Sequence, residues 1–147
     1  MAMEFSAASI DKLPTLDLAR LATWLVDTGL AGGRMEELVG GLCDRFNASG
    51  LRIARAYVAM STLHPLVRAY GYTWDRNQPV VQVNEFEHVD AQSQAWTDSP
   101  FNYMLSNNVD RLRRYLVGPQ AKLDFPVLAE FRDMGLDRKS TRLNSSH

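Results

Sequence analysis

Residues 51–74 read LRIARAYVAMSTLHPLVRAYGYTW, and this stretch decides the fold class. Apolar and polar side chains alternate weakly on both sides of the HP pair at 64–65, which is typical of two β-strands joined by a turn. A third alternating stretch follows the turn-forming DRNQ at 75–78. The three predicted strands, expected to form an antiparallel sheet, are 51–60, 67–74 and 79–86.

Two stretches with a helical period precede these strands. Apolar residues recur every three or four positions through 18–26 and again through 35–46, as on one face of an amphipathic helix. Thr15 or Asp17 is available to cap the start of the first helix, and Gly29 to end it. Helices grouped before a meandering set of strands indicate an α+β domain.

Gly40 and Gly41 lie inside the second predicted helix. Each costs about 1 kcal/mol relative to alanine in a helix interior. The pair therefore predicts close packing of this helix against another element.

The remainder of the chain carries weaker signals. Residues 1–14 are interpreted as a leader, and residues 88–108 as loop with one short helix around 101–105. A fourth strand is predicted over 112–117, and a short helix that ends at Gly135 follows it. The domain proper is thus expected to cover 15–136.

The last eleven residues, DRKSTRLNSSH at 137–147, differ sharply from what precedes them. They are polar and show neither the period of a helix nor that of a strand. The string resembles, residue for residue, the translation of a common short-read sequencing adapter. We therefore expect a non-native, disordered tail, and a natural sheet that continues beyond Leu136. A sheet cut at this point is expected to expose an unpaired edge and to aggregate.

Composition excludes several classes of protein. The chain has 46% apolar and 22% charged residues, within the globular range,. Without Arg138, Lys139, Arg142 and Asp137 of the tail, 13 basic and 16 acidic residues remain, a net charge of −3. This balance does not suit a phosphate backbone, so no nucleic-acid partner is expected. No secretion signal or membrane-length apolar run is visible, and Cys43 is the single cysteine, so a cytoplasmic location is expected.

A series of ordered landmarks resembles the N-terminal region of bacterial proteins that carry a class III adenylate/guanylate cyclase domain further downstream. The landmarks are STLHP at 61–65, the strand ending at Trp74, DSPF at 98–101, RLRR at 111–114, and LDFPVL at 123–128 before a helix that ends in MGL. Together with the helical pair they span 16–136.

This resemblance implies a GAF-like or PAS-like input module, meaning a curved antiparallel sheet flanked by helices. It implies a regulatory role in cyclic-nucleotide signalling, with a downstream cyclase domain as partner, a small-molecule ligand or protein partner, and a homodimer formed through the helices. A class III cyclase needs two metal-binding aspartates at the triphosphate, and the sequence shows no such arrangement. Neither catalytic residues, nor a metal, nor a cofactor are expected in this chain.

Two groups of side chains and one histidine are candidates for ligand binding. The aromatic residues Tyr70, Tyr72 and Trp74 could line a pocket on the sheet or pack in the core. Arg111 and Arg113 point one way along their strand and Arg114 the other, so they could meet an anionic ligand or form salt bridges to the acidic stretch 85–87. His64 could contact a ligand or act as a general base, or could simply stabilise its turn.

The acidic residues near position 87 and the single cysteine are each predicted to have no binding or catalytic role. Glu85 and Glu87 share one face of their strand and His88 takes the other, so with Asp90 they predict a solvated strand edge rather than a cation site. Cys43, in a helix rich in buried positions, is predicted to be inert. Two alternative functions stay open: a structural dimerisation module without ligand, and a small enzyme using His64 with Glu85 and Glu87.

Overall fold

The computed structural model describes residues 2–7, 17–63, 67–78, 80–87 and 93–143, and their fold is α+β. Two helices are followed by a meander of antiparallel strands, as predicted. The elements in chain order are β1 (Ala2–Ala7), α1 (Leu18–Leu30), α2 (Met35–Ala48), β2 (Ile53–Ser61), β3 (Val67–Asp75), β4 (Gln82–Glu87), α3 (Gln94–Thr97), α4 (Pro100–Ser106), β5 (Arg111–Tyr115), α5 (Pro126–Asp133) and β6 (Arg138–Leu143).

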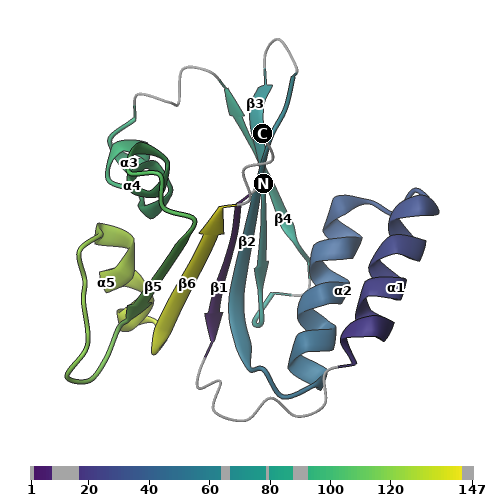
Figure 1. The fold of residues 1–147 in the computed structure, drawn as a ribbon, viewed down its shortest axis with the longest axis horizontal. Helices are drawn as coiled ribbons and strands as arrows, with labels where there is room; N and C mark the ends of the chain where they lie inside the picture. Colours follow the sequence, from purple (N-terminus) through teal and green to yellow (C-terminus); the bar gives the residue numbers. More distant parts are fainter. Residues whose placement is uncertain (1, 8–16, 64–66, 79, 88–92, 144–147) are drawn as a thin grey trace.

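The strands form one sheet in the order β4-β3-β2-β1-β6-β5, with every neighbouring pair antiparallel. The α1–α2 pair lies on one side of the sheet and α3, α4 and α5 on the other (Figure 1). Successive residues of β2 show this division. Ala56 is buried in the cluster that contains α2, whereas the guanidinium of Arg55 lies 5.7 Å from the ring centroid of Phe131 in α5.

Two hydrophobic clusters hold these layers together. The larger one joins α2 to β2 and β3 and contains Val39, Cys43, Ile53, Ala56, Val58, Tyr72 and Trp74. The second joins α4 and α5 to β5 and contains Met104, Leu112, Leu116, Phe125, Leu128 and Phe131. The two clusters lie on opposite faces of the sheet, so the two helical groups pack independently of each other.

Of the capping signals predicted for the first helix, one is confirmed and one is wrong. The Asp17 carboxylate accepts the backbone N–H of Arg20 at 3.0 Å and begins α1. Gly50, with φ of 92°, follows α2 in the left-handed conformation that glycine adopts without strain,. The expectation that Gly29 ends α1 was wrong, because the helix continues to Leu30 and the left-handed residue is Gly32, with φ of 80°.

Two segments excluded from the predicted fold are strands in the structure. Residues 2–7, interpreted as part of a leader, form β1, and residues 138–143, expected to be disordered, form β6 between β1 and β5. Both lie between two neighbours and gain two ladders of backbone hydrogen bonds, which do not depend on an apolar sequence. Side-chain pattern alone therefore failed to identify these strands.

Candidate functional site

The described residues proposed for ligand binding lie in two separate places, the aromatic residues on β3 and the arginines on β5. Tyr72 and Trp74 are 9% and 8% exposed and belong to the cluster beneath α2, with Tyr70 packed against it. Core packing therefore accounts for most of their contacts. Arg111 and Arg113 are exposed on β5, which is separated from β3 by β2, β1 and β6. His64 lies outside the described residues.

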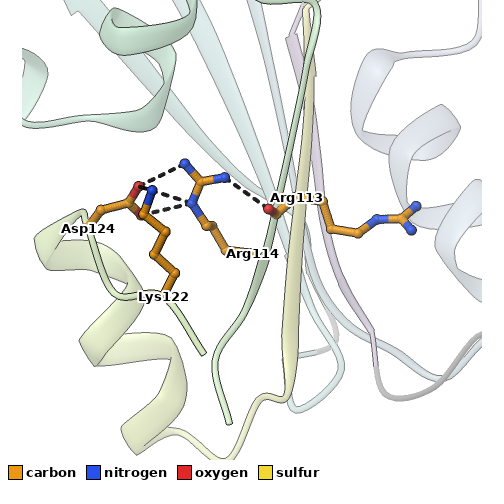
Figure 2. A network of polar contacts seen from close by, with 4 residues as sticks. All are labelled: Arg113, Arg114, Lys122 and Asp124. Carbon is orange, nitrogen blue, oxygen red and sulfur yellow. Dashed lines mark hydrogen bonds and ion pairs between the residues drawn. The ribbon is translucent and has the colours of Figure 1, made fainter. Parts of the chain in front are cut away.

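The expected salt bridges between the arginines and the acidic stretch 85–87 are not formed, because β4 and β5 are opposite edges of the sheet. Arg114 instead binds Asp124, in the segment before α5 (Figure 2). Its Nε donates to Oδ1 at 2.9 Å and its Nη2 to Oδ2 at 2.7 Å. The prediction that Arg113 and Arg114 leave the strand on opposite faces is confirmed, and Figure 2 shows both directions.

This ion pair is a structural contact between β5 and the segment that leads into α5. The hydrogen bond from Arg114 holds the pKa of Asp124 below its ordinary value, with a further contribution from Lys122, whose Nζ is 3.5 Å from Oδ2. A carboxylate with a lowered pKa stabilises the fold at neutral pH and loses that contribution as the pH falls through its folded-state pKa. The pair therefore supports the fold at neutral pH.

The remaining titratable candidates lie only partly within the described residues. Glu85 and Glu87 are exposed on the edge strand β4, and His88 and Asp90 lie outside the described residues. Within the described ranges, no three histidine, cysteine, aspartate or glutamate side chains lie so as to hold a metal ion. Cys43 is fully buried, and burial raises the pKa of its thiol to about 12, so it is not a reactive thiolate,.

The structure shows a different candidate site, a hollow of about 690 Å³ between the first turns of α2 and the turn after β3. We call it the α2 hollow. Trp74 contributes apolar surface to its wall, and Val80 and Val81 add more from the segment before β4. Its charged residues are Arg34, Glu36, Glu37, Asp44, Asp75 and Arg76.

Both arginines of the α2 hollow already have partners. Arg34 donates to the Glu36 carboxylate at 2.5 Å. Arg76 donates to the backbone carbonyl of Ile53, through Nη2 at 2.6 Å and Nε at 3.1 Å. Four carboxylates against two guanidinium groups leave a formal charge of −2 on the lining. The α2 hollow therefore favours a cation over an anion.

Sequence reasoning named Trp74 but missed the α2 hollow. Its walls come from the start of α2 and from residues 74–81, which are distant in sequence and meet only when α2 packs on β3. The available signal was the glycine pair in α2. A Cβ added to Gly40 would lie 3.4 Å from Val81, so this glycine marks the side of α2 that faces the 74–81 segment.

Comparison with known proteins adds no relative: no protein-family model, no curated protein and no solved structure matches this chain. None of the helices in the described ranges is both long and apolar enough to cross a membrane.

Proposed function

We propose that this chain is a GAF-like or PAS-like signal-input module of an adenylate/guanylate cyclase-type signalling protein, non-catalytic in itself, that binds a small molecule in the α2 hollow. Two things support the proposal. The ordered landmarks between 16 and 136 resemble such modules, and the observed α+β arrangement is compatible with them. A downstream cyclase domain is the partner that this module would regulate.

The observation that carries the proposal is that the α2 hollow lies against a pair of helices that pack on each other. Helix α2 borders the hollow at Gly40 and Gly41. Toward α1, the guanidinium of Arg45 stacks 3.6 Å from the ring centroid of Trp24, a cation–π contact worth about 0.5–2 kcal/mol. A ligand between α2 and the 74–81 segment would thus bias the position of both helices.

The lining specifies the chemistry of that ligand. Asp44 is exposed and charged, Trp74 offers an aromatic wall, and the two guanidinium groups are engaged. A small organic amine can place its ammonium near Asp44 and its carbon chain against Trp74 and Val81. The net negative charge of the lining would repel an anionic nucleotide.

A thermal-shift titration with agmatine and spermidine, and with adenosine monophosphate as the anionic counterpart, tests this function. A ligand present at 100 times its dissociation constant stabilises the native state by about 2.7 kcal/mol, which is roughly 5–10 °C in Tm at this chain length. We expect such a rise with an amine and none with the nucleotide.

The matched variants are Asp44→Asn in the α2 hollow and Asp110→Asn, an exposed aspartate outside it. Loss of one near-contact charge is worth about 1 kcal/mol, so Asp44→Asn should weaken amine binding about fivefold. Asp110→Asn should bind as the parent does. No shift with either amine, or equal weakening by both variants, would contradict a cation site in the α2 hollow.

A further inference from the structure

Two carboxylates of the α2 hollow, those of Glu37 and Asp44, lie on one face of α2. The two residues are seven positions apart, so they lie within about 20° of each other around the helix axis and about 10 Å apart along it. Their neighbours on that face are the residues three and four positions away. These neighbours are Gly40 and Gly41, which also line the hollow. Between the two acids, the floor of the hollow is therefore bare helix backbone, which we call the glycine floor.

Apolar side chains flank the glycine floor. Helix α2 lies between α1 and the sheet (Figure 1). A Cβ added at Gly40 would lie 3.4 Å from Cγ2 of Val81, and one added at Gly41 would lie 2.6 Å from Cζ2 of Trp24 in α1. Backbone without side chains allows a ligand to approach closely. Val81 and Trp24 would confine such a ligand to the line between the two acids.

The charges differ between the ends and the middle of the glycine floor. Glu37 and Asp44 are exposed, and neither forms an ion pair within the described part of the chain. Glu37 accepts the backbone N–H of Arg34 at 3.3 Å, through Oε2 alone. Beside Gly41, however, Nη1 of Arg45 donates to the Gly41 carbonyl at 3.0 Å and brings a positive charge. The two ends therefore favour cations, and the middle favours an uncharged group.

We propose that the ligand of the α2 hollow is a linear diamine, with an ammonium group at each end of an uncharged chain about 10 Å long. One ammonium pairs with Glu37 and the other with Asp44, and the methylene chain crosses the glycine floor against Val81. This inference rests on the proposed function and narrows it, because a cation site with one acidic contact would not select for the length of an amine.

Calorimetric titration of the full chain tests the length and the charge of the ligand. Diaminooctane has two ammonium ends, octylamine has the same chain with one, and putrescine is too short to reach both acids. The second charge pair should make diaminooctane bind about fivefold more tightly than either of them. Spermidine is similar in length to diaminooctane but should bind more weakly, because its inner ammonium would lie near Arg45.

Glu37→Gln identifies the second contact. Glutamine also serves at the third position of a capping box, so this variant loses the charge and keeps the start of α2. Its affinity for diaminooctane should fall about fivefold, to that of octylamine. Octylamine can still pair with Asp44, so its own affinity should change much less. Glu130→Gln, at an exposed position of α5 outside the hollow, is the control and should bind both amines as the parent does.

The outcomes separate this inference from the proposed function, with circular dichroism to verify that each variant folds. Octylamine or putrescine binding as tightly as diaminooctane would leave an amine site in place but overturn the ligand with two charged ends. Equal weakening of diaminooctane and octylamine by Glu37→Gln would do the same. If none of these amines binds, the proposed function fails together with the inference.

Discussion

Replacing Gly41 with alanine should lower the free energy of unfolding by up to about 2 kcal/mol, although alanine is the better helix former. An added Cβ would lie 2.6 Å from Cζ2 of Trp24 and 2.7 Å from its Cη2. Real side chains do not approach so closely, so Trp24 must move away from Arg45, whose guanidinium now stacks on its ring. Overpacking typically costs about 1–3 kcal/mol, which exceeds the propensity gain of about 1 kcal/mol.

Gly40→Ala is the matched control in the same helix. Its added Cβ would be 3.4 Å from Val81, an ordinary contact. The variant gains the same helix propensity without the clash and should stabilise the chain by up to about 1 kcal/mol. Chemical denaturation of both variants measures the difference. Equal effects of the two alanines would show that α1 does not pack on Gly41 as the structure places it.

Deleting residues 137–147 should leave the half of the sheet that β6 joins, around β1 and β5, without a cooperative unfolding transition. It should also cause aggregation. β6 is bonded on both sides, to β1 and to β5, so its removal leaves two open strand edges and uncovers the cluster around Leu112 and Phe131,. Dye binding to exposed apolar surface and light scattering report this outcome. A sharp, reversible, monomeric transition for residues 1–136 would contradict it.

A point variant separates the role of the strand from that of its side chains. Thr141 is fully buried, and its hydroxyl has no hydrogen-bond partner in the part of the chain that the structure describes. Thr141→Val keeps the shape and both ladders while removing a buried polar group, and should raise the free energy of unfolding by about 1–3 kcal/mol. The deletion and this variant should thus act in opposite directions, because β6 contributes through its backbone.

The sequence predicted the parts of the fold that have strong local patterns. The two helices, the strands β2 to β4 and the helix that ends at Gly135 were found because their apolar periods run over several residues and end at turn-forming positions,. β1 and β6 were not found, since each is held in the sheet mainly by backbone pairing with its two neighbours. Which strands are neighbours depends on long-range pairing that no local period specifies.

The candidate site was predictable only in part. Tyr72 and Trp74 were correctly placed on β3, but their burial against α2 follows from a helix–sheet contact that spacing does not reveal. Arg114 has a partner ten residues downstream, Asp124, rather than the acidic stretch that sequence reasoning offered. The α2 hollow is lined by residues about forty positions apart in the sequence. It forms only when α2 packs against the sheet, so no local sequence pattern predicts it.

The most direct test of the central claim, that this chain is the input module of a cyclase-type signalling protein, is the nucleotide sequence of the source locus downstream of the codon for Leu136. If the proposal is right, the open frame encodes, downstream of this module, a domain with the two metal-binding aspartates of a class III cyclase. A frame that closes shortly after Leu136, or that encodes no such domain, would contradict the account.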